Sequence, residues 1–108
     1  WTSATVSTEW SYLDWPVSSA DLEKLRGVRF VFTSGSHALE IDGVELLENG
    51  KIIARDQHAG LAGKPSRGNF YKLSLPKGIH ANNGCSLRAR VRSVGGKSSN
   101  GKLELIKE

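Results

Sequence analysis

The sequence predicts an all-β protein, an antiparallel β-sandwich with one short helix. Twelve glycines and frequent turn signals separate short apolar runs along its 108 residues, and this spacing is typical of sandwiches and barrels. The segment 85–93 alternates strictly between apolar and basic residues, as a strand with one buried face does. We therefore expect one module over residues 1–108. Because the chain opens on Trp1 and contains no methionine, we expect it to be excised from a larger multidomain protein.

The first half of the chain is expected to hold strands at 2–7 and 28–33, with the helix between them at 18–26. Ser18 is a helix cap, acids come early and bases late in this segment, and Gly27 follows as a stop signal. Leu39 and Ile41 continue the strand pattern, but the next apolar pair is Val44 and Leu46. This phase slip at residues 42–43 predicts a β-bulge or tight bend.

The second half begins at Asn49-Gly50, the strongest short signal for a hairpin, because both residues tolerate a positive φ. Strands are expected at 51–56, 70–75 and 85–93, with Leu103 and Leu105 in the last one. Glycine-rich loops are expected at 60–68 and 95–101. Cys85 is the single cysteine, and its strand position predicts a small buried hydrophobe rather than a reactive thiol.

The net charge is +4, and the basic excess lies in the second half of the chain. This asymmetry is typical of a basic surface for an anionic partner, although charge for solubility is the alternative reading. Apolar stretches are too short to cross a bilayer, and no signal peptide is visible. No membrane partner is expected.

Several segments together resemble one family. They are residues 32–50, the run 56–60 with Gly63, Asn69 and Tyr71 after it, and the runs 88–92 and 95–101. They resemble the galactose-binding-like jelly-roll modules appended to bacterial glycoside hydrolases, in particular the C-terminal domain of some β-hexosaminidases. The resemblance spans the chain from about Trp15 onward. The sequence departs from a typical sugar-binding module because no aromatic residue is evident in the late loops.

The resemblance implies a non-catalytic accessory module that is secreted, periplasmic or at the cell surface. Its implied partners are a glycan and the catalytic domain of the parent protein. A structural calcium ion is also implied, with Asp42 and Asp56 as candidate oxygen ligands, and no other cofactor is expected.

The feature that most directly indicates a binding site is a row of three arginines, Arg88, Arg90 and Arg92. Alternate strand residues lie about 6.7 Å apart on one face, so the row is able to grip carboxylates or sulfates. The alternative is cross-strand pairing with acids of the chain itself. The candidate acids are Glu40, Asp42, Glu45 and Glu104.

Asp56 and His58 stand two apart on a strand and therefore share a face. They could orient a sugar hydroxyl, or they could form a hydrogen-bonded structural pair at the start of a loop. The loop 60–68 that follows has the same two readings, a ligand-facing loop or an ordinary hairpin connection. In the first reading the donors are Lys64, Arg67 and Asn69, with Tyr71 at the base of the loop.

Three aromatic residues near the start, Trp10, Tyr12 and Trp15, could form a stacking platform for sugar rings, or they could pack in the core and seams of the sandwich. Trp15 is expected in the core, and Trp10 is the expected exposed member of the group. No convincing catalytic set is present. The leading hypothesis is a carbohydrate-binding module of a secreted glycoside hydrolase, for acidic or amino sugars. A structural spacer without a ligand is the alternative. A nucleic-acid-binding β domain is the lesser alternative, because the aromatics and the arginines lie on distant segments and the net charge is modest, so nucleic acid is not an expected partner.

Overall fold

The computed structural model describes residues 1–63, 65–97 and 99–107, and its strands form two sheets. The first part of the chain forms β1 (Ala4–Val6), β2 (Ser11–Val17), α1 (Ser19–Glu23), β3 (Leu25–Ser34) and β4 (Leu39–Glu48). The second part forms β5 (Lys51–Ala62), β6 (Phe70–Lys72), β7 (Cys85–Ser93) and β8 (Ser99–Lys107). The predicted all-β architecture is confirmed.

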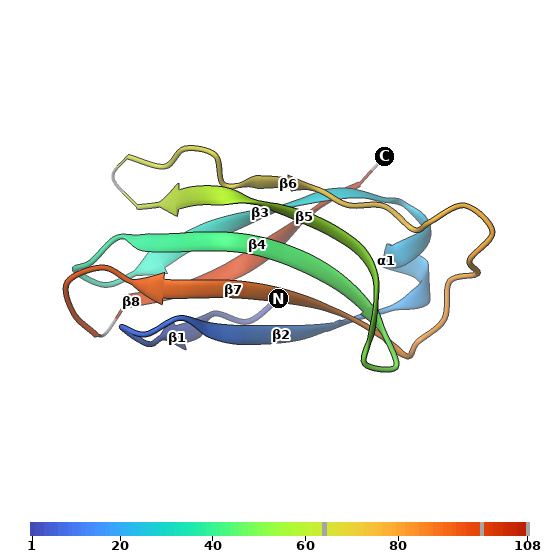
Figure 1. The fold of residues 1–108 in the computed structure, drawn as a ribbon, viewed down its shortest axis with the longest axis horizontal. Helices are drawn as coiled ribbons and strands as arrows, with labels where there is room; N and C mark the ends of the chain where they lie inside the picture. Colours follow the sequence, from blue (N-terminus) through green and yellow to red (C-terminus); the bar gives the residue numbers. More distant parts are fainter. Residues whose placement is uncertain (64, 98, 108) are drawn as a thin grey trace.

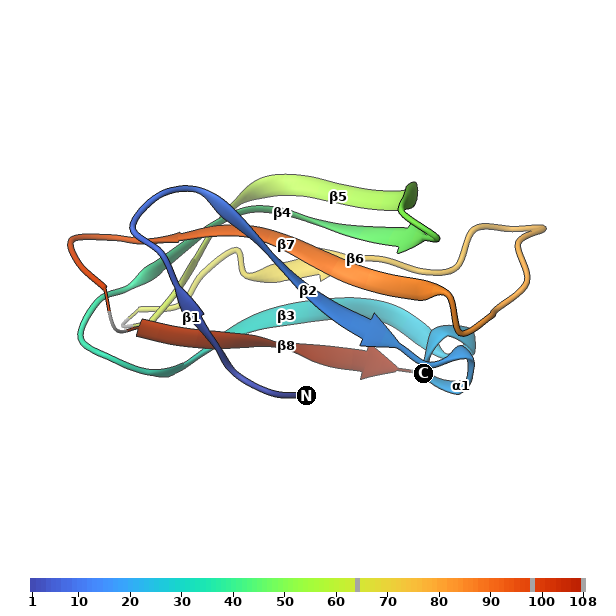
Figure 2. The same ribbon diagram turned by 90° about the horizontal axis from the view of Figure 1, so that it is seen from below.

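The two sheets are antiparallel and pack face to face, as Figures 1 and 2 show from two directions. In the described residues one sheet has the strand order β1-β8-β3-β6, and we call it the β3 sheet. The other has the order β2-β7-β4-β5, and we call it the β7 sheet. Strands that are neighbours in a sheet are mostly distant in the sequence, so the fold depends on long-range pairing.

The core lies between the sheets and follows the predicted alternation. Leu87, Ala89 and Val91 of β7 are buried, whereas the arginines between them lie on the outer face. From the opposite sheet, Phe30 meets Trp15 in an edge-to-face contact with ring centroids 6.4 Å apart. Trp15 is therefore a core residue, as its position predicted.

The bulge and the hairpin predicted for β4 and β5 are both present. The register of β4 shifts between Ile41 and Gly43 against both of its neighbours. Asn49 and Gly50 join β4 to β5 with φ angles of 49° and 85°, the left-handed backbone that this dipeptide was expected to adopt.

The helix begins as predicted but ends earlier. The Ser18 side chain accepts a hydrogen bond from the Asp21 backbone N–H, and the helix stops at Glu23. Gly27 was expected to end the helix, which is wrong, because it lies inside β3. Among the described residues no helix is long and apolar enough to cross a membrane.

Several strand boundaries also differ from the prediction, because pairing with a neighbouring strand decides where each strand ends. The strand expected at 2–7 covers Ala4–Val6, and the one expected at 28–33 covers Leu25–Ser34. Gly60 belongs to β5 and Gly101 to β8, so both glycine-rich loops are shorter than expected. The strand expected at 70–75 ends at Lys72, although Leu73 is still buried.

Strand β2 was not predicted, and it matters most for function. It pairs with β7 along its whole length, from Ser11 opposite Val91 to Val17 opposite Cys85. Pro16 lacks a backbone donor and is tolerated because β2 is the edge strand of its sheet. The pairing places the aromatic residues of this segment beside the arginines of β7.

Candidate functional site

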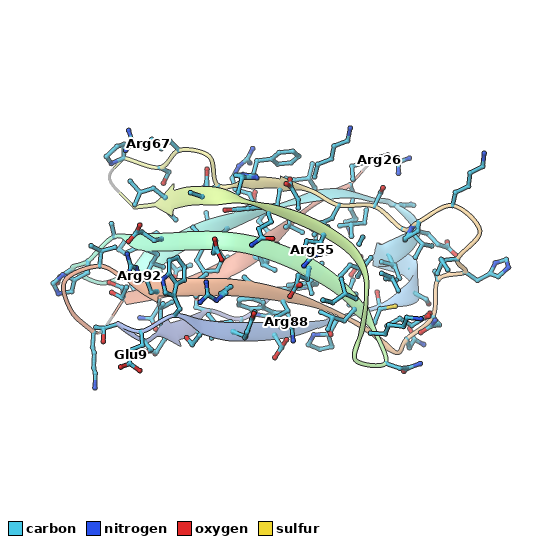
Figure 3. All side chains as sticks on the ribbon, in the orientation of Figure 1. Glu9, Arg26, Arg55, Arg67, Arg88 and Arg92 are labelled. Carbon is cyan, nitrogen blue, oxygen red and sulfur yellow. The ribbon has the colours of Figure 1, made fainter. Side chains whose placement is uncertain are left out.

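The outer face of the β7 sheet gathers most of the side chains predicted for a site. Arg88, Arg90 and Arg92 run along β7, an inner strand of this sheet, and Figure 3 labels Arg88 and Arg92. On one side Tyr12 stands opposite Arg90 in register. On the other side Glu45 and Glu40 of β4 stand opposite Arg88 and Arg92, and Asp42 lies at the bulge beside Gly43, the register partner of Arg90. Directly opposed residues of antiparallel strands share a face, so these groups lie close together.

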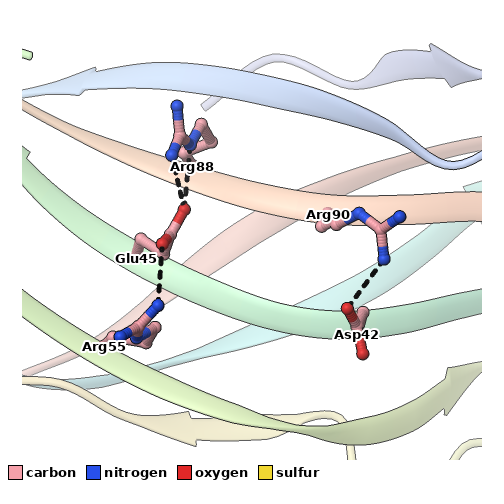
Figure 4. A network of polar contacts seen from close by, with 5 residues as sticks. All are labelled: Asp42, Glu45, Arg55, Arg88 and Arg90. Carbon is pink, nitrogen blue, oxygen red and sulfur yellow. Dashed lines mark hydrogen bonds and ion pairs between the residues drawn. The ribbon is translucent and has the colours of Figure 1, made fainter. Parts of the chain in front are cut away.

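Each arginine of β7 is paired with an acid of β4. Arg88 donates from Nε and Nη2 to one carboxylate oxygen of Glu45, at 3.0 and 2.7 Å. Figure 4 shows this pair together with Arg90, which donates to Asp42 at 2.8 Å. Arg92 pairs with Glu40 at 2.8 Å, and Arg55 of β5 makes a weaker contact with Glu45 at 3.8 Å.

Cross-strand pairing is therefore the reading that the structure supports for the arginine row. The hydrogen bond to Glu45 raises the pKa of Arg88 above its ordinary value. Glu104 was also expected as a partner of the row, and this is wrong. It lies on β8 of the other sheet, 3.9 Å from Arg29.

The depth of the ion pairs predicts unequal contributions to stability. The Arg88 and Glu45 side chains are 27% and 13% exposed, whereas those of Arg92 and Glu40 are 41% and 37% exposed. We expect Arg88→Met to lower the free energy of unfolding by about 1–2 kcal/mol, and Arg92→Met by about 0.5 kcal/mol. Urea unfolding of both variants measures the difference, and an equal loss would contradict the burial argument.

Two aromatic rings pack against the arginines. The guanidinium of Arg88 lies 4.3 Å from the Tyr12 ring centroid, and those of Arg90 and Arg92 each lie 4.8 Å from the Trp10 ring centroid. Trp10 is partly buried by these contacts, whereas Tyr12 remains 51% exposed. Trp10 was expected as the exposed aromatic, and the structure gives that place to Tyr12.

A hollow of about 320 Å³ opens on this face beside Tyr12, and we call it the Tyr12 hollow. Gln57 lines it from β5 and has no hydrogen-bond partner among the described residues, so its amide is available to a ligand. The remaining lining residues are Asp42, Gly43, Glu45, Arg55 and Arg90. The hollow thus combines an exposed aromatic ring with hydrogen-bonding groups.

Asp56 and His58 face inward, away from the Tyr12 hollow. Asp56 accepts a hydrogen bond from the Lys72 backbone N–H at 2.7 Å, which links the edge strands of the two sheets. The His58 ring contacts the Asp56 carboxylate through Nδ1 at 3.1 Å and the Gly68 carbonyl oxygen through Nε2 at 2.9 Å. The pair lies within β5 rather than at the start of a loop, and its groups are engaged in holding the fold.

The side chains of Tyr71 and Asn69 also make contacts that hold the fold together. The Tyr71 ring stacks on His58 with centroids 4.1 Å apart, and its buried hydroxyl donates to the His58 carbonyl oxygen at 3.0 Å. The Asn69 side chain donates to the Phe30 carbonyl oxygen. Of the loop donors predicted for a ligand, Arg67 is exposed, and Lys64 lies outside the described residues.

The buried Tyr71 hydroxyl predicts a loss of stability at alkaline pH. Burial, followed by the charges of Asp56 and Asp42, raises the pKa of Tyr71 above its ordinary value. Since the tyrosine of the unfolded chain ionises near pH 10, stability is fully present below that pH and is lost above it. We expect Tyr71→Phe to lose about 1 kcal/mol at pH 7 and to decline less steeply above pH 10. Melting temperatures of the parent chain and of Tyr71→Phe that fall with the same slope above pH 10 would refute this prediction.

Burial likewise raises the pKa of the Cys85 thiol, and the free cysteine is buried as its position predicted. Within the ranges that the structure describes, no group of three or more His, Cys, Asp or Glu side chains could hold a metal ion. Asp42 and Asp56, the candidate calcium ligands, do not share a site. Asp42 points to the outer face and binds Arg90, whereas Asp56 points inward.

Sequence reasoning found the arginines and missed their companions on the face. Arg55 and Gln57 line the hollow without having been candidates, and Tyr12 was considered among the aromatics near the start but Trp10 was preferred as the exposed one. A signal was present for two of them, because Arg55 and Gln57 have the same strand parity and so share one face. Tyr12 could not be placed without the pairing of β2 with β7.

No protein-family model and no curated protein matches this chain.

Proposed function

We propose that this chain is a non-catalytic carbohydrate-binding module that holds a sugar in the Tyr12 hollow. The observation that carries the proposal is the composition of this hollow, in which a half-exposed aromatic ring adjoins polar side chains on a sheet surface. The sequence resemblance to the accessory modules of secreted glycoside hydrolases points to the same class of ligand. Such a module would act beside a catalytic domain outside the cell.

The chemistry of the hollow suits a sugar ring. One face of a pyranose carries C–H groups that pack on an aromatic ring, while its hydroxyls need hydrogen-bonding partners at the edge. Tyr12 would supply the ring, and Gln57 would supply a donor and an acceptor from β5. The stacking of Arg88 on Tyr12 holds the platform in place before the ligand arrives, which lowers the entropy cost of binding.

The charge balance of the face favours a neutral sugar over an acidic one. Every arginine of β7 already has a carboxylate partner within 3 Å. An acidic sugar would have to displace an acid of β4 and leave it unpaired, which costs free energy. We therefore propose neutral sugars, N-acetylated amino sugars included, in place of the acidic sugars that the arginine row alone suggested.

A glycan array with the isolated chain tests the proposal. We expect saturable retention of neutral glycans that changes less than about twofold between low and high salt, because no net charge is neutralised on binding. Arg90→Ala should weaken retention, and Arg29→Ala on the opposite sheet should leave it unchanged. Absence of sugar-specific retention, or a steep loss with salt, would refute the proposal.

A spacer module is the second candidate, favoured by the outer face of the β3 sheet. Phe70 is exposed there and stands in register with Arg29, which also stands opposite Glu104. Lys72 and Lys102 have the parity of this outer face, so cationic groups surround an aromatic residue there and would complement an acidic protein surface. The glycan array separates the two candidates, because a spacer shows no sugar-specific retention.

A further inference from the structure

A second hollow lies on the same face as the Tyr12 hollow, farther along β5. It measures about 370 Å³, and we call it the Arg67 hollow. Its lining residues are Glu40, Ala59, Gly60, Leu61, Arg67 and Gly68. Arg55, Gln57, Ala59 and Leu61 alternate along one strand, so the two hollows follow each other on one sheet surface. From Arg55 to Leu61 the strand advances about 20 Å, which is longer than a single sugar ring.

The sheet surface between the two hollows carries no large side chain at Ala59, and we call this surface the path. Gln57 lines the first hollow and Ala59 the second, and alanine raises only a methyl group above the sheet. On the neighbouring strand, Asp42 lines the first hollow and Glu40 the second. Hydrogen-bonding groups therefore flank the path, while its floor carries no large side chain at Ala59.

The far end of the path offers a positioned donor. Arg67 is exposed, and no partner for its guanidinium lies among the residues that the structure describes. Its backbone is fixed, because Arg67 and Leu61 exchange two hydrogen bonds of 2.8 Å. A donor on an anchored backbone needs little ordering when it binds a ligand. Glu40, the acid of this hollow, is already paired with Arg92.

A second route leads toward the same end of the sheet, along β7 instead of β5, because Leu61 and Arg92 both stand opposite Glu40, and this route is obstructed. A third hollow, lined by Thr8, Arg92 and Val94 among others, lies beyond Arg92 at the other side of β7. The Trp10 ring and the guanidiniums of Arg90 and Arg92 stack between that hollow and the Tyr12 hollow. A ligand that leaves the Tyr12 hollow therefore meets an obstacle along β7 and an open surface along β5.

We propose that the ligand is a linear neutral oligosaccharide that begins on Tyr12 of β2, crosses the Tyr12 hollow to Gln57 of β5 and then follows β5 to Arg67. This inference rests on the proposed function and extends it from one sugar to a chain. The charges again match a neutral ligand, since among the described residues five of the six ionic groups that line the two hollows are already paired with acids or bases of the sheet. These five are Glu40, Asp42, Glu45, Arg55 and Arg90. Arg67 is the remaining donor.

Isothermal titration with ladders of β-1,4-linked glucose, mannose, xylose and N-acetylglucosamine, from the disaccharide to the hexasaccharide, tests the proposal. For the ladder that binds, we expect affinity to rise about tenfold or more with length and then level off. Ala59→Ile fills the path with an aliphatic side chain, and Arg67→Ala removes the far donor. Each variant should remove the gain with length and leave disaccharide affinity unchanged.

Thr8→Ile is the matched control, because it adds similar bulk in the third hollow. It should leave all affinities unchanged. Affinity that does not depend on length, with the disaccharide still bound, would overturn the oligosaccharide path and leave the sugar site standing. A length effect that Thr8→Ile removes and Ala59→Ile does not would also overturn it. Failure of all ladders to bind, together with an empty glycan array, would overturn both proposals.

Discussion

Tyr71→Ala is expected to lower the free energy of unfolding by about 3–5 kcal/mol, the range typical of truncating a large buried aromatic residue. Tyr71 is among the largest fully buried side chains and lies on β6, the short edge strand of the β3 sheet. Its ring stacks on His58 and its hydroxyl binds the His58 carbonyl oxygen, so one side chain joins the edges of both sheets. Urea denaturation at pH 7 measures the loss.

The neighbouring residue provides a control for this prediction. Phe70 precedes Tyr71 on the same strand, but its side chain is 41% exposed on the outer face. We expect Phe70→Ala to lose about 1 kcal/mol, because its ring is only partly removed from water. If Tyr71→Ala lowered the free energy of unfolding by no more than Phe70→Ala does, the contacts of Tyr71 with His58 would not stabilise the sandwich by joining β6 to β5.

Tyr12→Ala is expected to weaken glycan binding by about 30-fold or more, equivalent to the loss of about 2 kcal/mol that marks an aromatic hot spot. The ring is half exposed beside the hollow and contributes little to the core, so the variant should remain folded. Titration with a retained glycan gives the affinity, and a urea curve checks that stability has changed by less than about 1 kcal/mol.

Two further variants refine this result. Tyr12→Phe keeps the stacking surface and removes the hydroxyl, so its affinity should fall far less than that of Tyr12→Ala. Phe70→Ala removes an exposed aromatic from the opposite sheet and should bind as the parent does. Undiminished binding by Tyr12→Ala would mean that the sugar contacts another surface.

Local signals predicted much of the fold. The strict alternation in β7 identified which side chains fill the core, because one face of the strand is fully covered. The phase slip near Gly43 became a bulge, and Asn49-Gly50 became a hairpin, since both depend on a few adjacent residues. The pairing of Arg90 with Asp42 was one of two readings that the composition of the strands allowed.

The parts that could not be predicted depend on long-range pairing. Strand β2 contains Pro16, and nothing in its own sequence indicates that it pairs with β7, which follows about 70 residues later. Without that pairing, neither the stacking of Arg88 on Tyr12 nor the Tyr12 hollow could be inferred. Parity placed Asp56 and His58 on one face, but only the packing of β6 against β5 determines that this face is the inner one.

Chemical-shift mapping by NMR is the most direct test of the claim that the outer face of the β7 sheet binds sugar. In a titration of the ¹⁵N-labelled chain with a glycan retained on the array, we expect the largest shifts on β2 near Tyr12, on β4 near Asp42 and on β5 near Gln57. The backbone of β8 and β3 around Arg29 should hardly move. Shifts concentrated on the β3 sheet, with Tyr12 and Gln57 unaffected at saturation, would contradict the account.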